Sequence, residues 1–215
     1  MLYLDSAIVP EAREVAQWGW VKGITTNPTL LAKSELSPEA TLKQLKEAIS
    51  GEIYYQLISD TFEAMVAEGQ AAFKLLEAQT VLKIPATPLG FQVTAHLSSE
   101  IPCAVTAIYS PAQAAVAQAA GAKYAIAYVN RATRFLGDGI ALVQQMADVL
   151  AGSETKILAA SIKSPEEAAA TIRAGACHLT LPYEILKAIA THSLSDETVE
   201  QFAQSGVGLS SQVIS

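Results

Sequence analysis

The sequence predicts an α/β fold: a single-domain (β/α)8 (TIM) barrel over residues 1–215, with an additional C-terminal helix at about 195–205 and a flexible tail at 206–215. Eight short runs rich in Val, Ile, Leu and Tyr alternate with Ala-, Glu- and Leu-rich stretches of helical spacing. Little polar alternation breaks these runs, which is typical of parallel strands covered on both faces. Divided among eight units, the 215 residues give about 27 residues per unit, near the practical minimum for this barrel.

The predicted strands are Leu2–Asp5, Val21–Thr26, Ile53–Ile58, Thr80–Ala86, Cys103–Tyr109, Tyr124–Asn130, Lys156–Ser161 and His178–Pro182. An open doubly wound sheet could share the alternation, but one that binds nucleotide has a glycine-rich first turn. The first turn here is Asp5-Ser6-Ala7-Ile8, and neither GxGxxG nor GxxxxGK[ST] occurs in the chain. The barrel is therefore favoured.

Helix starts are predicted where a capping hydroxyl stands directly before a proline. This pattern occurs at Ser37, Ser110 and Ser164. Asp60 and Asp138 are predicted to cap the helices that follow the third and sixth strands.

The composition excludes several classes of protein. Hydrophobic residues make up 51% of the chain and charged residues 16%, which excludes a disordered tail, a collagen-like fibre and a nucleic-acid-binding arm. The net charge of −7 argues against a nucleic-acid partner. No apolar run could span a bilayer and no secretory signal opens the chain, so we expect no membrane partner and a cytoplasmic location. Cys103 and Cys177 are expected to be buried apolar residues, because their spacing fits neither a metal site nor a disulfide framework.

Polar residues stand at the ends of seven of the eight predicted strands, where the interior of a barrel is normally apolar. They are Asp5; Thr26 and Asn27; Gln56; Lys83; Thr106; Tyr128 with Asn130 and Arg131; and Ser161. Active sites of these barrels lie at the carboxyl ends of the strands. We therefore expect these side chains to meet at one mouth.

Lys83 carries the sharpest prediction, because it lies inside the apolar run Val81-Leu82-Lys83-Ile84-Pro85. A lysine inside a barrel is either paired with a carboxylate or partly deprotonated, since burial disfavours the ammonium form. The structural interpretation is a lysine that either extends its amine to the surface or forms a salt bridge. The functional interpretation is an amine nucleophile that forms a Schiff base with a ketone or aldehyde.

The other residues also have structural interpretations. Asp5 could cap the first helix, Thr106 could be an ordinary strand threonine, and Ser161 could form a turn. Gln56 and Asn130 are harder to explain in this way, because buried amides need partners for both ends. Their joint occurrence around one buried lysine indicates a site.

The three histidines, His96, His178 and His192, fall in stretches that cannot converge at the mouth. Neither a metal site nor a hydrolase triad is therefore predicted, and we expect no cofactor.

Four segments in order resemble motifs of the transaldolase family: Gly23–Leu31, Val81–Pro85, Tyr128–Arg131 and Ala159–Pro165. The resemblance runs from Leu2 to about Gly206. It is closest to the short subfamily that holds fructose-6-phosphate aldolase and the small transaldolases.

The resemblance implies an imine mechanism on a ketose, in which Lys83 attacks the C2 carbonyl and the iminium accepts the electrons of the C3–C4 bond. It implies that Asp5 and Asn27 hold donor hydroxyls, with Asp5 handling the proton of the C4 hydroxyl. Ser161 would contact the region of the C1 hydroxyl, and Arg131 would bind the phosphate of the aldehyde. The substrate-binding set so implied is Thr26, Asn27, Asn130, Arg131 and Ser161.

Two branches of the subfamily differ in their proton carriers. The transaldolase branch has a Glu on the third strand and a Phe on the sixth. The aldolase branch has a Gln on the third strand and a Tyr on the sixth, with a Thr on the fifth strand that shares a bound water. This chain has Gln56, Tyr128 and Thr106. The resemblance thus predicts cleavage and synthesis of fructose 6-phosphate from dihydroxyacetone and glyceraldehyde 3-phosphate, ahead of transfer between sugar phosphates in the pentose phosphate pathway.

Three further expectations accompany this prediction. The resemblance implies a homo-oligomeric ring, a pentamer or decamer. Arg134 could reinforce phosphate binding or face solvent. A third class of function, a barrel that has become a non-catalytic binding module, is disfavoured because the pocket residues are present at every motif.

Overall fold

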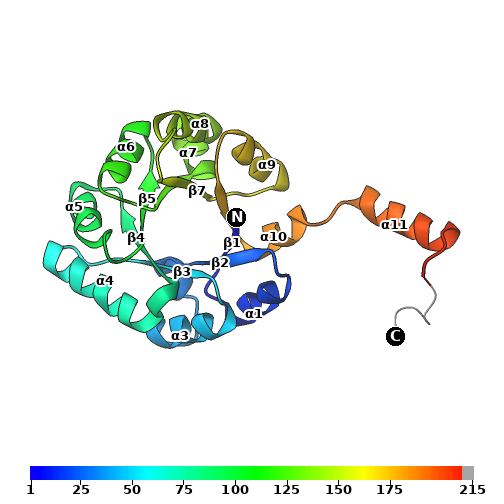
Figure 1. The fold of residues 1–215 in the computed structure, drawn as a ribbon, viewed down its shortest axis with the longest axis horizontal. Helices are drawn as coiled ribbons and strands as arrows, with labels where there is room; N and C mark the ends of the chain where they lie inside the picture. The colour runs from blue at the N-terminus through cyan, green and yellow to red at the C-terminus, as the bar shows by residue number, and fades with distance from the viewer. Residues whose placement is uncertain (210–215) are drawn as a thin grey trace.

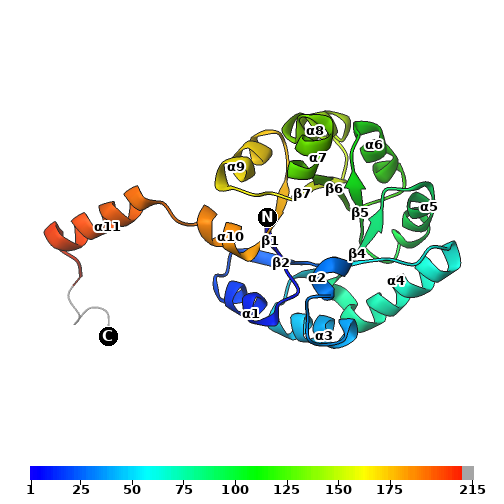
Figure 2. The same cartoon turned by 180° about the vertical axis from the view of Figure 1, so that it is seen from behind.

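The computed structural model describes residues 1–209, and within them eight parallel strands close into a barrel in sequence order. Figures 1 and 2 show the strands as an inner ring with helices around it. The strands are β1 (Leu2–Asp5), β2 (Val21–Thr25), β3 (Glu52–Gln56), β4 (Thr80–Pro85), β5 (Cys103–Ile108), β6 (Tyr124–Tyr128), β7 (Lys156–Ala160) and β8 (His178–Leu181). The predicted (β/α)8 fold is therefore confirmed.

The helices in chain order are α1 (Val9–Gln17), α2 (Pro28–Leu31), α3 (Pro38–Ala48), α4 (Phe62–Leu76), α5 (Pro88–Leu97), α6 (Pro111–Ala119), α7 (Val129–Leu136), α8 (Gly139–Val149), α9 (Pro165–Arg173), α10 (Tyr183–Ile189) and α11 (Ser193–Ser205), with a 3-10 turn, η1, at Glu77–Gln79. Ser37, Ser110, Ser164 and Asp138 cap helices as predicted. The prediction for Asp60 is wrong, because Thr61 accepts the capping hydrogen bond of α4 from the Ala64 amide.

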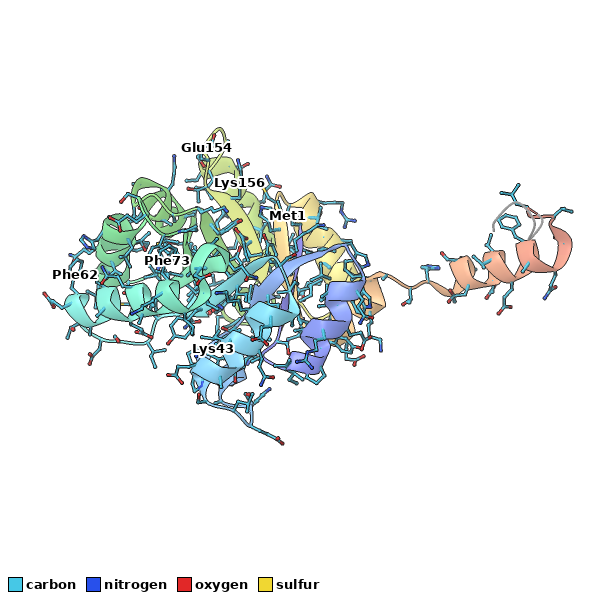
Figure 3. The ribbon with its side chains drawn as sticks, turned by 60° about the horizontal axis from the view of Figure 1, so that its bottom comes forward. Met1, Lys43, Phe62, Phe73, Glu154 and Lys156 are labelled. Atoms are coloured by element: carbon cyan, nitrogen blue, oxygen red, sulfur yellow. The ribbon has the colours of Figure 1, made fainter. Side chains whose placement is uncertain are left out.

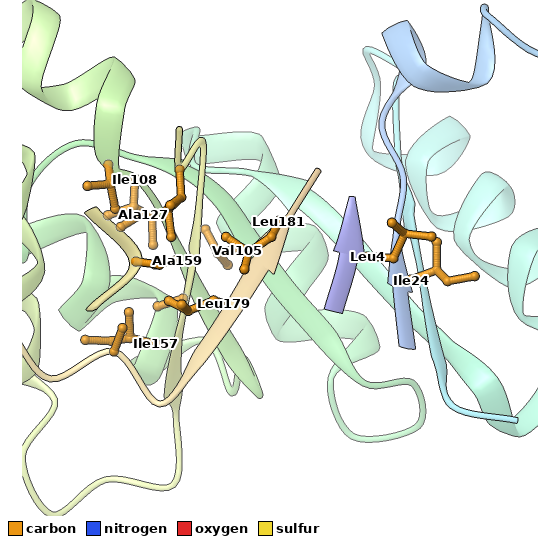
Figure 4. Packing of buried hydrophobic residues seen from close by; sticks show 14 of the residues in the cluster. Leu4, Ile24, Val105, Ile108, Ala127, Ile157, Ala159, Leu179 and Leu181 are labelled. Atoms are coloured by element: carbon orange, nitrogen blue, oxygen red, sulfur yellow. The ribbon is translucent and has the colours of Figure 1, made fainter. Parts of the chain in front are cut away.

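Alternate residues of each strand face opposite sides of the barrel wall. The outward residues, among them Leu4, Ile24, Val105, Ile157 and Leu179, are buried between the sheet and the helices (Figure 4). This contact explains why the strands read as almost continuous apolar runs, since both faces are covered.

The inward residues of the middle of the barrel form a separate cluster that includes Tyr3, Tyr54, Ala104, Ile126 and Leu158. The tyrosine rings of this cluster leave room for only a small residue on the neighbouring strand. A Cβ on Gly23 would lie 2.9 Å from a ring carbon of Tyr3 and 2.3 Å from the Glu52 carbonyl oxygen, so only glycine fits at that point of β2.

The amino-terminal end of the barrel is closed by hydrogen bonds that converge on Glu52. Its carboxylate accepts from the hydroxyls of Tyr3 (2.8 Å), Tyr54 (3.0 Å) and Tyr124 (3.0 Å) and from the Lys123 ammonium (2.7 Å). Burial alone would raise the pKa of Glu52, but these hydrogen bonds outweigh it and hold the pKa below its ordinary value. Burial likewise raises the pKa of the Tyr3 and Tyr54 hydroxyls, which keeps both as donors.

His178 lies at the same end, where its Nδ1 is 3.1 Å from the N-terminal nitrogen of Met1. Burial and the neighbouring N-terminal charge lower the pKa of His178 to about 4, so the ring is neutral and Nδ1 accepts the hydrogen bond. These residues line a hollow of about 1010 Å³, and Figure 3 shows Met1, Glu154 and Lys156 of its wall toward one edge of the molecule.

Two strands end two residues earlier than predicted, and β2, β4, β5, β7 and β8 each end one residue earlier. β3 ends at Gln56 instead of Ile58, and β6 ends at Tyr128 instead of Asn130. Helix α7 begins at Val129 without a side-chain cap, so Asn130 belongs to a helix. The sequence gives no signal for the transition from β6 to α7, because no capping residue or proline precedes the helix.

The predicted C-terminal helix is present as α11, and all of its residues are exposed. It extends away from the barrel in both views (Figures 1 and 2). Of the predicted tail at 206–215, residues 210–215 lie outside the described residues. Cys103 is buried as expected, whereas Cys177 is exposed, because it precedes β8 and lines the hollow at the amino-terminal end. Within residues 1–209 no helix is long and apolar enough to cross a membrane.

Candidate active site

A pocket of about 420 Å³ opens at the carboxyl end of the barrel, opposite the larger hollow beside Glu52. The smaller pocket is the candidate site, because the chemistry-bearing residues gather there and active sites of these barrels lie at that end. Its lining includes nine polar residues from six strands or the segments that follow them: Asp5, Asn27, Thr29, Gln56, Lys83, Tyr128, Arg131, Ser161 and Lys163.

Lys83 lies at the floor of this pocket and is only 4% exposed. Its Nζ donates to the Thr26 carbonyl oxygen at 2.9 Å, and no carboxylate lies within ion-pair distance of it in residues 1–209. Burial lowers the pKa of Lys83, against the opposing attraction of the Asp5 carboxylate. The salt-bridged interpretation of this lysine is therefore wrong, and the amine has the environment of a nucleophile.

The Asp5 carboxylate is held from below by two buried threonines. The Thr25 hydroxyl donates to Asp5 Oδ1 at 2.8 Å, and Thr180 Oγ1 lies 2.6 Å from Thr25 Oγ1. Because the single Thr25 proton is used on Asp5, the Thr180 hydroxyl must be the donor to Thr25. Asp5 does not cap the first helix, since α1 begins after Ile8.

Gln56 and Lys83 are register partners on β3 and β4, so their side chains are neighbours on the inner face. The Gln56 Oε1 atom is buried and has no hydrogen-bond partner in the described chain. A buried amide oxygen of this kind normally bonds to water or to a ligand. Its position in the lining fits it to receive such a donor from the pocket.

Across the pocket, the Tyr128 hydroxyl lies 2.9 Å from Oγ1 of Thr106, a buried residue that does not itself line the pocket. Burial raises the pKa of Tyr128, which the hydrogen bond with Thr106 partly offsets. The phenol is thus a neutral hydroxyl that can carry a proton at the wall of the site.

The rim of the pocket is cationic on one side. Arg131 stacks over the Tyr128 ring, with 5.1 Å between its guanidinium carbon and the ring centroid, and Lys163 also lines the opening. Ser161, which also lines the pocket, has its backbone in the left-handed region, at φ 61°. Ser161 lies in the irregular loop after β7 instead of in a turn.

Three predicted site residues are placed differently from the rest. Asn27 lines the pocket, and its Oδ1 also caps α2 by accepting from the Leu30 amide at 2.9 Å. Thr26 contributes its carbonyl to Lys83, while its hydroxyl donates to the Tyr54 carbonyl at 2.7 Å. Asn130 is not among the lining residues, because its amide donates to Glu167 at 3.3 Å.

Arg134 is exposed and lies over the Phe135 ring, away from the pocket lining. His96 lies in α5, His178 begins β8 and His192 precedes α11, so none of them reaches the mouth. In residues 1–209 no group of three His, Cys, Asp or Glu side chains could hold a metal ion.

Sequence reasoning missed two features of the site. The first is the pair formed by Thr25 and Thr180, which brings the eighth strand into the site. The second is Lys163, the only lining lysine besides Lys83. Lys163 could have been found, since it follows Ser161 by two residues at a strand end, whereas a threonine within an apolar strand has no distinguishing signal.

Comparison with known proteins agrees with this geometry. The family model described as transaldolase/fructose-6-phosphate aldolase matches residues 2–212. A protein of Symbiobacterium thermophilum named "Probable transaldolase" is 35% identical over 204 residues, which cover 94% of each chain. A protein of Aquifex aeolicus with the same name is 34% identical over 203 residues and 93% of each chain.

Solved structures of mandelate oxidase share the barrel, with TM-scores of 0.60 at 14–15% identity over 85–86% of this chain, among them a complex with (S)-2-phenylpropionate. The match spans about 64% of the length of those chains, and at this identity the likeness concerns the fold alone. The family model and the curated relatives cover nearly the whole chain. The protein belongs to the transaldolase/fructose-6-phosphate aldolase family.

Proposed function

We propose that this protein is a class I aldolase that cleaves and forms fructose 6-phosphate, with dihydroxyacetone and glyceraldehyde 3-phosphate as the products of cleavage. The observation that carries the proposal is the buried Lys83 amine, which has a lowered pKa and lies in a polar pocket beside Asp5, Gln56 and Tyr128. A neutral amine in such a pocket is suited to attack a carbonyl carbon.

In the proposed reaction the neutral Lys83 amine adds to the C2 carbonyl to give a carbinolamine, whose hydroxyl takes a proton from solvent and leaves as water, so that a positively charged iminium remains. The Asp5 carboxylate then takes the proton of the C4 hydroxyl. The electron pair of the C3–C4 bond passes into the iminium, which releases the aldehyde and leaves an enamine on Lys83. The hydrogen bond from Thr25 supports this role, because it fixes the orientation of the carboxylate.

The fate of the enamine separates an aldolase from a transaldolase. In an aldolase the enamine carbon receives a proton and water hydrolyses the resulting iminium, which frees dihydroxyacetone and restores the amine. Tyr128, held by Thr106, and a water bonded to the unpaired Gln56 oxygen would together supply that proton. A carboxylate in place of Gln56 would instead favour retention of the enamine for a second aldehyde.

The phosphate of the aldehyde would lie at the cationic rim. Arg131 presents a planar fork of donors that suits phosphate oxygens, and Lys163 adds a second positive charge at the same opening. The implied substrates are therefore small sugar phosphates, with Asn27 and Ser161 holding hydroxyls of the donor.

Transaldolase activity is the second candidate, and the names of the curated relatives favour it. The two candidates share every step up to the enamine, so both fit Lys83 and Asp5. They differ at Gln56, where the amide in this chain supports the aldolase.

Assays with fructose 6-phosphate, alone and with erythrose 4-phosphate added, test the proposal. We expect turnover without the acceptor, measured as released glyceraldehyde 3-phosphate. Strict dependence on erythrose 4-phosphate would establish the transaldolase instead. The Gln56→Glu variant provides a second test, because it should shift the ratio of free dihydroxyacetone to transfer product toward transfer. An unchanged ratio would contradict the proton-delivery role.

The apolar residues exposed on α11, which include Leu194 (62% exposed), Val199 (66%) and Phe202 (69%), support a further part of the proposal, that the enzyme assembles as a homo-oligomeric ring. Sedimentation equilibrium of the full chain should give the mass of a pentamer or decamer. A monomer at micromolar concentration would contradict the assembly without affecting the chemistry.

A further inference from the structure

We infer that Glu167, which lies in α9 outside the pocket, is a positioning residue that sets the affinity of the mouth for the phosphate of its substrate. The inference rests on the proposed function, because it assumes that the cationic rim binds phosphate. It concerns a residue that touches none of the reacting atoms and that the motif comparison does not single out.

The Glu167 carboxylate joins two segments of the rim. Its Oε1 accepts from the Asn130 amide nitrogen at 3.3 Å, and its Oε2 accepts from the backbone N–H of Lys163 at 2.6 Å. Asn130 belongs to the first turn of α7 and Lys163 to the loop after β7. One side chain therefore holds the start of a helix and a neighbouring loop at a fixed separation.

Each of these segments carries one cation of the rim. Arg131 directly follows Asn130, and Lys163 is itself the residue whose N–H is bound. A backbone hydrogen bond from the Asn130 N–H to the Ser161 carbonyl oxygen, at 3.0 Å, links the same two segments a second time. Relative movement of the segments would change the distance between the two positive charges that we assign to phosphate.

The left-handed backbone of Ser161 is a second, independent sign that this loop needs support. A non-glycine residue at φ 61° is strained, and this backbone conformation persists only where the surrounding contacts enforce it. The bonds from Asn130 to the Ser161 carbonyl and from Lys163 to Glu167 restrain the chain on both sides of this position. Glu167 thereby helps hold the Ser161 and Lys163 side chains toward the pocket.

Glu167 is itself well anchored. Its backbone N–H donates to the capping Ser164 hydroxyl at 3.1 Å, and the Thr171 hydroxyl donates to its carbonyl at 2.7 Å. The carboxylate lies in the first turn of α9, where negative charge is favoured. The support therefore comes from a regular helix instead of from another loop.

Because Glu167 is negatively charged, the direction of the change in phosphate affinity on its removal distinguishes two roles for the carboxylate. If the carboxylate acted mainly by repelling the phosphate, its removal would strengthen phosphate binding. If it acts by holding the two segments, its removal weakens binding although a negative charge has been lost. The geometry supports the second outcome, because both carboxylate oxygens are engaged by N–H donors of the rim.

The experiment compares Glu167→Ala with Glu166→Ala, a matched control on the exposed neighbouring carboxylate. Synthesis from dihydroxyacetone is measured with glyceraldehyde 3-phosphate and with unphosphorylated glyceraldehyde. For Glu167→Ala we expect KM for the phosphorylated aldehyde to rise about tenfold, with kcat and the KM for glyceraldehyde within about threefold of the wild type. The control should match the wild type for both aldehydes.

Binding of inorganic phosphate, measured by calorimetry, keeps this test separate from that of the reaction. Weaker phosphate binding in Glu167→Ala, by about tenfold, supports the inference even if the enzyme proves to be a transaldolase. Glu167→Gln keeps the shape of the side chain but places an amide NH2 against one of the two N–H donors. This variant should lose less phosphate affinity than Glu167→Ala, and it allows the test to proceed if the alanine variant does not fold. Unchanged or tighter phosphate binding in these variants, or an equal loss with both aldehydes, would overturn the inference.

Discussion

Glu52 and Gln56 lie on the same strand and face the same interior, yet one closes the amino-terminal end of the barrel and the other lies at the mouth. The Glu52 carboxylate accepts from three tyrosine hydroxyls and a lysine. The Gln56 carbonyl oxygen has no partner among the described residues. Four residues along β3 thus separate a fully satisfied polar group from an unsatisfied one.

The backbone differs between the two ends in the same way. Left-handed positions in the loops that lead into strands are occupied by glycine at Gly19, Gly121, Gly152 and Gly175, and Glu77 before β4 is the exception. At the mouth, left-handed positions are occupied by Ala107 and Ser161, which adopt them at a cost. Satisfied hydrogen bonds and glycine turns stabilise one end, whereas the other keeps a desolvated amine, an unpaired amide and strained residues. The comparison predicts that substitutions at the mouth mainly reduce activity, whereas substitutions at the end beside Glu52 mainly reduce the free energy of unfolding.

The largest expected effect comes from Lys83→Met at the mouth. The variant should lose activity by at least about 10³-fold, because Lys163, the other lysine of the lining, is exposed at the rim instead of buried at the floor of the pocket. Its midpoint of thermal unfolding should not fall, since an apolar side chain of similar size replaces a buried amine. Steady-state assays and thermal denaturation check both parts. A variant that loses activity only because it unfolds would break the comparison.

Glu52→Gln at the closed end should do the reverse. We expect the free energy of unfolding to fall by about 2 kcal/mol at pH 7, because Lys123 and the tyrosines lose a charged acceptor, while kcat stays within about threefold. The pKa of Glu52 is lowered in the folded state, so its contribution is present above the ordinary value of 4.5 and is lost as the pH falls below it. Urea denaturation at several pH values should therefore show the difference from wild type shrinking in acid.

A smaller effect is expected from Thr180→Val. This variant removes the hydroxyl that donates to Thr25, which in turn donates to Asp5. We expect kcat to fall by about tenfold with little change in KM, because Thr25 can then turn its hydroxyl away from the carboxylate. Thr180→Ser should restore most of the activity. Thr94→Val, at an equally buried threonine of α5, serves as the control. The same loss in the control would leave no positioning role for Thr180.

The smallest effect is a gain in stability from Ala107→Gly, which makes one position of the mouth resemble the loops at the other end. Relief of the left-handed backbone at φ 62° should raise the free energy of unfolding by about 0.5–1 kcal/mol. Ala104→Gly, in the same strand and fully buried, should instead be destabilising. Urea unfolding curves of the two variants would show opposite shifts, and shifts of the same sign would contradict the account of strain.

The strands and most of the mouth could be predicted because they depend on local sequence. Apolar runs mark strands covered on both faces, and Lys83 is conspicuous within such a run. Asn130 was misplaced because α7 begins without a capping residue, so the end of β6 leaves no trace in the sequence. Thr25 and Thr180 come together across 155 residues of chain, and threonine is common in strands that have no functional role.

Glu167 shows a further limit of the same kind. In the sequence it belongs to an acidic pair after Ser164 and Pro165, which indicates the start of a helix and nothing more. Only the barrel brings it between Asn130 and Lys163. Contacts between consecutive loops at the mouth depend on the pairing of neighbouring strands such as β6 and β7, which strand periodicity alone does not describe.

Reduction with borohydride in the presence of dihydroxyacetone tests most directly whether the Lys83 amine captures the ketone. Intact mass and peptide analysis should find one reduced three-carbon unit on Lys83 in the wild type and none in the Lys83→Met variant. A wild-type protein that gains no mass, or a modification located on another lysine, would contradict the mechanism.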